Sequence, residues 1–169
     1  EAISKLKKLG VKNIIMLTGD TKQKAKMIAD ELGINEVRAE LLPQDKAKIV
    51  KELMNEGKKV AFVGDGINDA PALISAHVGI SMSRGADIAK ATADISLLKD
   101  DIMAVVEAKE YANKTMNLIN NNFNATVGIN SCILAGATFG VFSPIVTAVL
   151  HNGTTIGLLF NSIKGVNTR

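Results

Sequence analysis

The chain has 169 residues, a net charge of +3 and 22% charged residues, which gives room for one domain, or for one domain and a small appendage. Aromatic residues make up only 4% of the chain, and no basic stretch is interleaved with them, so the composition argues against a nucleic-acid partner. The single cysteine, Cys132, excludes an internal disulfide and is typical of a reducing compartment.

The charges are unevenly distributed along the sequence. All 17 acidic residues and all but two of the 20 lysines and arginines precede Asn117, and only Lys164 and Arg169 follow it. Such a break predicts a water-soluble part followed by a segment in a different environment. The chain does not begin with methionine, and residues 1–10 already have a helical pattern, so we expect it to be a piece of a longer protein.

Strand and helix patterns alternate with short links through residues 1–100. The expected helices are 1–10, 21–32, 43–56, 68–75 and 86–91, and the expected strands are 11–17, 36–40, 60–64, 78–82 and 95–98. This order predicts an α/β fold with parallel strands and right-handed crossovers, a Rossmann-like sheet that is incomplete at its front edge.

A longer helix with an apolar stripe is expected over residues 101–122, and it either covers the sheet or forms a stalk that leaves the domain. From Thr115 to Ile163 no residue carries a formal charge, and a helix that spans a membrane needs about 20 residues. We therefore expect a two-helix transmembrane hairpin in 123–163, with helices at 123–142 and 145–163 and a turn at Ser143-Pro144. The alternative is a hairpin buried in the protein core.

Cations flank this uncharged run. Lys109 and Lys114 precede it, and Lys164 and Arg169 lie in the tail formed by residues 164–169. Because cytoplasmic flanks are enriched in lysine and arginine, both ends are expected on the cytoplasmic side. The sequence thus predicts an integral protein of the cytoplasmic (plasma) membrane, surrounded by the lipid bilayer, with residues 1–100 in the cytoplasm.

The most informative stretch is the apolar strand and loop from Val60 to Pro71. Asp65 ends the strand between Gly64 and Gly66, and Asn68 and Asp69 follow within one helical turn. Carboxylates on a glycine-rich loop at the carboxyl end of a parallel strand suit Mg²⁺ and a phosphate group that it holds. The glycines let the backbone approach such a cofactor closely or take a positive φ. The alternative is a solvated turn with a helix cap.

Two further motifs occupy the same place in their own strand–helix units. Thr18-Gly19-Asp20 ends the first strand, where a hydroxyl and free N–H groups can hold phosphate, although a helix N-cap at Asp20 or Thr21 is the alternative. Lys46 lies in the first turn after Pro43, where it can reach a phosphoryl group. By itself Lys46 resembles the many solvated lysines around it.

In this order and spacing, the motifs resemble those of P-type ATPases, the haloacid-dehalogenase-like ion pumps. The resemblance implies that residues 1–100 are the C-terminal part of a phosphorylation domain that uses Mg²⁺ and ATP. Thr18 would then bind phosphoryl oxygens, Lys46 would offset their charge, and Asp65 would bind Mg²⁺. Asn68 and Asp69 would hold the surroundings, with Asp69 as a further candidate near the metal.

The family's nucleophile, an aspartate in Asp-Lys-Thr-Gly, is absent from the sequence. By the same resemblance, the nucleotide site would lie mostly on a missing domain, and the N-terminal half of the same polypeptide would be the chain's main partner. We therefore expect a fragment of a translocating enzyme that is inactive alone. Two alternatives stay open: a membrane-anchored phosphatase of the same superfamily, and a non-catalytic module that binds Mg²⁺ or phosphate.

The cargo implied by the resemblance is a divalent transition metal. The second uncharged stretch contains His151, Thr154 and Thr155, and the first contains Asn130. Imidazole, amide and hydroxyl groups are metal ligands, although His151 could equally be a packing residue. The cluster is similar to the signature of cobalt-type pumps, with Asn152 in place of a glutamate, and a His-Asn pair also resembles manganese-type relatives. The expectation is cobalt, nickel, iron or manganese.

Overall fold

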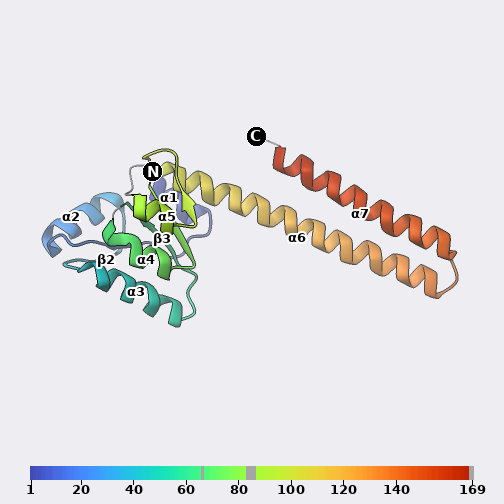
Figure 1. The fold of residues 1–169 in the computed structure, drawn as a ribbon, viewed down its shortest axis with the longest axis horizontal. Helices are drawn as coiled ribbons and strands as arrows, with labels where there is room; N and C mark the ends of the chain where they lie inside the picture. The colour runs from blue at the N-terminus through green and yellow to red at the C-terminus, as the bar shows by residue number, and fades with distance from the viewer. Residues whose placement is uncertain (66, 83–86, 168–169) are drawn as a thin grey trace. The chain divides into compact units, whose positions relative to one another are not determined.

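The computed structural model describes residues 1–65, 67–82 and 87–167 (Figure 1). The chain divides into two compact units, Glu1–Lys109 and Glu110–Arg169, each of which is considered by itself. The first unit contains all the strands of the described residues, and the second is helical.

The first unit alternates helices and strands in the predicted order, which confirms the α/β fold. Its helices are α1 (Ala2–Lys8), α2 (Lys22–Leu32), α3 (Pro43–Asn55), α4 (Ala70–Ser75), α5 (Asp87–Thr92) and the short 3₁₀ turn η1 (Ile67–Asp69). Its strands are β1 (Ile15–Leu17), β2 (Glu36–Arg38), β3 (Ala61–Gly64), β4 (Val78–Ser81) and β5 (Ile95–Ser96). Glycines with a positive φ follow three of these helices: Gly10 at 93° after α1, Gly33 at 72° after α2 and Gly57 at 80° after α3.

All the strand pairs are parallel, as predicted, but the described pairings form two small sheets rather than one. β1 pairs with β2, and β3, β4 and β5 pair in that order. Side chains connect the two sheets, because Leu17 of β1 packs against the core cluster that contains Phe62 of β3. β1 and β3 therefore border one core, although the described backbone groups of these strands do not pair.

Two apolar clusters hold the unit together. Val50 of α3, Phe62 of β3, and Ala72 and Leu73 of α4 form one cluster. Ile80, Leu97 and Val105 form the other, and Val105 lies in the first turn of α6 (Met103–Thr138). The start of α6 thus covers the sheet, which is one of the two roles considered for residues 101–122.

The second unit pairs the rest of α6 with α7 (Pro144–Asn167). The turn falls at Ser143-Pro144 as predicted, since proline is favoured at the first helical position. Contacts between the helices include a polar group in which Asn122 Nδ2 donates to Ser162 Oγ at 2.7 Å and Asn161 Nδ2 donates to Asn122 Oδ1 at 2.7 Å.

The structure has helices over the places expected for a transmembrane hairpin, 123–142 and 145–163. Of the helices in the described residues, none combines the length and the hydropathy that crossing a membrane requires. The expectation rested on the lack of formal charges, but uncharged amides and imidazoles are also strongly hydrophilic. Asn124 and Asn130 in α6, and His151 and Asn152 in α7, lower the mean hydropathy of the two helices.

Candidate functional site

The loop after β3 places Asp65 at the carboxyl end of a strand. Its side chain is exposed and makes no hydrogen bond or ion pair with another described residue. Gly64 before it is buried, and a Cβ there would lie 2.7 Å from Asp69 Cβ, closer than real Cβ contacts. The backbone at Gly64 thus approaches Asp69 closely, while the expected approach to a cofactor stays a prediction. Gly66, the other predicted cofactor-binding glycine, lies outside the described residues.

Asp69 is the central side chain of the site. It is 7% exposed and lies in η1, directly before α4. Its Oδ1 is 2.7 Å from Lys46 Nζ, and its Oδ2 accepts the backbone N–H of Asp65 at 3.3 Å. One carboxylate therefore holds the Asp65 loop and a lysine of α3 in a fixed relation.

Lys46 differs from the other lysines of its helix in burial. Its side chain is 18% exposed, whereas that of Lys48, two residues further on, is 70% exposed and pairs with Asp45. Pro43 opens α3, and the Asp45 carboxylate accepts the backbone N–H of Leu42 at 3.1 Å, which fixes the first turn. Because α3 packs against both η1 and α4, the first turn delivers Lys46 to Asp69.

The Thr18 loop is ordered by its own side chains. Thr18 Oγ1 accepts the backbone N–H of Asp20 at 3.1 Å and donates to Asp20 Oδ2 at 3.3 Å. Lys24 bonds the Asp20 carboxylate at 3.0 Å and holds its pKa below the ordinary value. Thr21 is the N-cap residue of α2, and its side chain makes no capping bond.

The structure brings some of the predicted residues together and not others. Lys46, Asp69 and the backbone of Asp65 are joined directly. Among the described residues, no hydrogen bond joins Thr18 to this group; the link is through packing, because Leu17 shares a core with α3 and β3. Asn68 is exposed, as are Gly19 and Asp20.

The sequence analysis did not single out residues 38–41, which bond to the Thr18 loop. The backbone of residues 38–41 makes three hydrogen bonds with residues 18–20. At its centre Glu40 has a positive φ of 58°. No glycine or asparagine marks this conformation, so nothing in the sequence pattern indicated it.

The donors at the β3 loop fit Mg²⁺. The ion prefers oxygen ligands and is usually held by one or two carboxylates together with phosphate oxygens and water. Asp65 supplies an accessible carboxylate, while both oxygens of Asp69 already have partners. Nowhere in the described residues do three histidine, cysteine or acidic side chains gather into a cluster, which would suit a different kind of metal centre.

The four residues considered for the transported ion lie in the second unit. His151 Nδ1 is 3.1 Å from Asn130 Oδ1, which joins α7 to α6. The hydroxyls of Thr154 and Thr155 donate to the carbonyl oxygens of Leu150 and His151 within α7. The structure therefore pairs two of the four side chains and turns the two hydroxyl protons toward the helix backbone.

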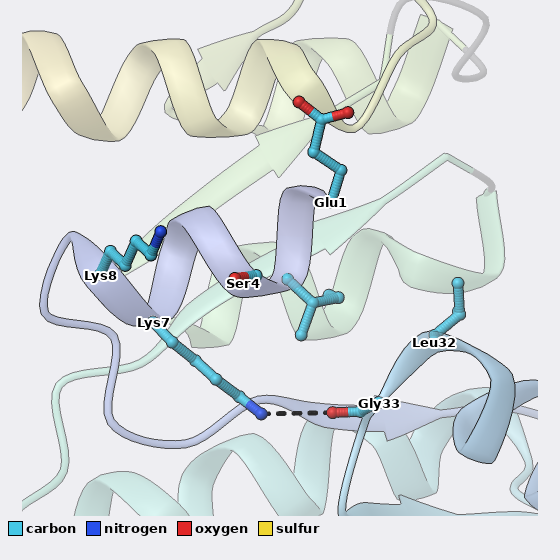
Figure 2. A pocket seen from close by; sticks show the side chains of 7 residues that line it. Glu1, Ser4, Lys7, Lys8, Leu32 and Gly33 are labelled. Carbon is cyan, nitrogen blue, oxygen red and sulfur yellow. Dashed lines mark hydrogen bonds between the residues drawn. The ribbon is translucent and has the colours of Figure 1, made fainter.

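A hollow of about 550 Å³ lies elsewhere in the first unit, between α1 and the end of α2 (Figure 2). Lys7, one of the residues that line it, donates to the carbonyl oxygen of Gly33 at 3.2 Å. None of the predicted site residues lines it. The candidate site is thus the open carboxyl edge of the strands and not this hollow.

Comparison with known proteins agrees with this geometry. Residues 1–77 match the haloacid dehalogenase-like hydrolase family. The whole chain is 41% identical to a manganese-exporting P-type ATPase of Mycobacterium leprae and 40% identical to a zinc-exporting P-type ATPase of Mycobacterium marinum. Each alignment covers 100% of this chain but only 23% of the relative.

A solved structure gives the same result. The crystal structure of a zinc-transporting PIB-type ATPase superposes with a TM-score of 0.89 at 37% identity, and the match covers 98% of this chain and 27% of that one. The chain thus spans about a quarter of the length of the proteins that it resembles.

Proposed function

We propose that this chain, whose residues 1–77 form a haloacid dehalogenase-like domain and which is homologous throughout to heavy-metal P-type ATPases, is part of an ATP-driven pump. The longer protein would export a divalent transition metal across a membrane. ATP hydrolysis would drive transport through an aspartyl-phosphate intermediate. The chain's own contribution would be to hold and neutralise the phosphoryl group.

The observation that supports this proposal best is the Lys46–Asp69–Asp65 arrangement. Phosphoryl transfer asks a protein mainly for positioning and for neutralisation of negative charge. Asp69 orients the Lys46 ammonium through a 2.7 Å contact and positions the Asp65 loop through the loop's backbone. A positive group and a metal-binding carboxylate are thereby held at the end of β3, where ligands collect in α/β folds.

The other predicted residues take supporting roles in this proposal. The Thr18 hydroxyl and the N–H groups of the Thr18-Gly19-Asp20 loop would bind phosphoryl oxygens at the end of β1. Asp65 would hold Mg²⁺, which when bound offsets charge on the phosphate. Asn68, exposed beside Asp69, would face the aspartyl-phosphate region.

The chain lacks the Asp-Lys-Thr-Gly string that carries the phosphorylated aspartate in this family. We propose that the nucleophile and most of the ATP site lie in another part of the same polypeptide, which would be the chain's main partner. The isolated chain would then incorporate no phosphate from ATP.

For the cargo we propose manganese first. The M. leprae relative is named a manganese exporter and the M. marinum relative a zinc exporter. Within the second unit, the imidazole of His151 and the amide of Asn130 form a nitrogen and oxygen pair across α6 and α7. The amide oxygen suits a hard cation such as Mn²⁺. Thr154 and Thr155 would add hydroxyl oxygens.

The test uses the longer protein in detergent with a panel of Mn, Fe, Co, Ni, Cu and Zn. We expect one metal to stimulate ATP hydrolysis in the wild type. Loss of one positioned phosphate-binding group costs about a hundredfold in rate, so Lys46→Ala should abolish the stimulation and the phosphoenzyme. Lys48→Ala, which removes an exposed lysine of the same helix, should not.

The outcomes separate the candidate functions. Stimulation that is lost in His151→Ala would assign His151 to the metal path, and equal stimulation would return it to packing. Hydrolysis of phosphate esters without metal stimulation would favour a phosphatase. Phosphate or Mg²⁺ binding without any turnover would favour a non-catalytic module.

A further inference from the structure

Glu40 has an unusual backbone conformation beside the candidate phosphate loop. Among the described residues it is the only non-glycine residue with a positive φ, at 58°. The left-handed region costs an L-residue free energy because Cβ crowds the following carbonyl, so other contacts must hold Glu40 there. Strain of this kind gathers at functional sites.

The contacts that hold it are backbone bonds to the Thr18 loop. The N–H of Glu40 donates to the carbonyl of Asp20 at 2.9 Å, and the next N–H, that of Leu41, donates to the carbonyl of Thr18 at 3.1 Å. The N–H of Thr18 donates in turn to the carbonyl of Arg38 at 3.0 Å. The left-handed turn at Glu40 lets two successive N–H groups reach carbonyls on either side of Gly19.

The two segments approach each other closely at Gly19. A Cβ at Gly19 would lie 3.3 Å from the carbonyl oxygen of Leu41, tighter than most real Cβ contacts. The Glu40 side chain adds little, because it is 53% exposed and its pairing with Lys22 is 3.6 Å long. The backbone at Glu40, not its charge, thus holds the Thr18 loop.

The same segment continues directly into the helix that carries Lys46. Leu42 is the N-cap of α3, and its N–H is bonded by the Asp45 carboxylate at 3.1 Å. Residues 38–42 are therefore bonded to the Thr18 loop at one end and fixed to the first turn of α3 at the other. Movement of this segment would shift Thr18 and Lys46 relative to each other.

We propose that Glu40 is a positioning residue for phosphate: its left-handed backbone sets the Thr18-Gly19-Asp20 loop against the first turn of α3. This inference rests on the proposed function, because it assigns the loop to phosphate binding. Glu40 touches neither the phosphate nor the metal and acts through the backbone of Thr18 and Asp20.

The experiment measures inhibition of the longer protein's metal-stimulated ATPase by orthovanadate, a phosphate analogue, together with KM for ATP. Glu40→Val, a β-branched residue that disfavours positive φ, should weaken inhibition about tenfold with KM for ATP unchanged. Glu40→Gly, which adopts the left-handed conformation freely, and Glu40→Gln, which removes only the charge, should stay within about twofold of the wild type.

Gly57→Val is the matched control. Gly57 also has a positive φ, of 80°, and a side chain there would meet nothing within 4 Å. The Gly57→Val variant therefore reproduces the backbone strain at a distance from the Thr18 loop, and it should leave orthovanadate inhibition unchanged.

Each outcome decides the inference. Weakened inhibition in Glu40→Val with rescue in Glu40→Gly supports it. Unchanged inhibition in Glu40→Val, or equal weakening in Gly57→Val, overturns it while leaving the pump assignment in place. A wild-type protein that forms no phosphoenzyme and is not inhibited by orthovanadate overturns the proposed function, and the inference with it.

Discussion

The pairing of Lys46 with Asp69 gives the sharpest prediction for the site. The two side chains are 18% and 10% exposed and lie 2.7 Å apart. Removing one partner of a buried ion pair leaves the other charge uncompensated and costs about 3–5 kcal/mol. Asparagine at position 69 has one oxygen for two donors, Lys46 Nζ and the N–H of Asp65, so one donor loses its acceptor. Because the pair is only partly buried, we expect Asp69→Asn to lower the free energy of unfolding by about 2–4 kcal/mol.

The assay is native-state hydrogen exchange of peptides from α3 and β3, because exchange reports the free energy of opening segment by segment. In a double-mutant cycle, Lys46→Met should restore much of the stability lost in Asp69→Asn, since both charges are then gone. The expected coupling energy is at least about 1.5 kcal/mol.

The exposed pair of Asp45 and Lys48 on the same helix is the matched control. Its atoms are 3.3 Å apart, and the lysine side chain is 70% exposed. The corresponding cycle should give a coupling below about 0.5 kcal/mol. Additive effects of Asp69→Asn and Lys46→Met, or equal coupling in the two cycles, would refute the reasoning.

Three further predictions concern other contacts. Gly64→Ala should push Asp69 away, destabilise the chain by about 1–3 kcal/mol and abolish the phosphoenzyme of the longer protein, as measured by hydrogen exchange and phosphate labelling. Lys24→Ala should raise the pKa of Asp20 toward its ordinary value in a carboxyl NMR titration. Asn122→Ala should remove two 2.7 Å bonds between α6 and α7 and increase exchange in α7, with a cost of about 1–3 kcal/mol.

Each of these three contacts has a control variant or a result that would contradict the expected role. Gly128→Ala adds a Cβ that meets nothing within 4 Å inside helix α6, so it should not destabilise the chain, and a loss equal to that in Gly64→Ala would contradict the steric argument for Gly64. Folding lowers the pKa of Asp20, so its carboxylate stabilises the folded state above the unfolded pKa. This contribution to stability is lost as the pH falls through the folded-state pKa. An unchanged titration in Lys24→Ala would show that Lys24 is not the cause. For α7, unchanged exchange in Asn122→Ala would show that apolar packing alone holds the helices.

The order of elements in the first unit could be predicted because its signals are local. Apolar runs, helical periodicity and the glycines and prolines at element ends act within a few residues, as at Gly33 after α2 and Pro43 at the start of α3. The expectation of membrane helices rested on the length of the run and on its lack of formal charges, and no helix of the described residues is long and apolar enough to cross a membrane. Uncharged polar side chains such as Asn130 and His151 also count toward hydropathy.

By itself the sequence determined the alternation of strands and helices and the three motifs at Thr18, Lys46 and Asp65. Only the tertiary structure decided that Lys46, among several similar lysines, is buried against Asp69, and that Asp69 also holds the Asp65 loop. The tertiary structure likewise decided the left-handed turn at Glu40, which the residue types in that segment do not predict. The physical reason is the distance along the sequence over which each interaction acts. Motifs and periodicity depend on neighbours in the sequence, whereas burial, ion pairing and backbone strain depend on which distant segments the packed core brings together.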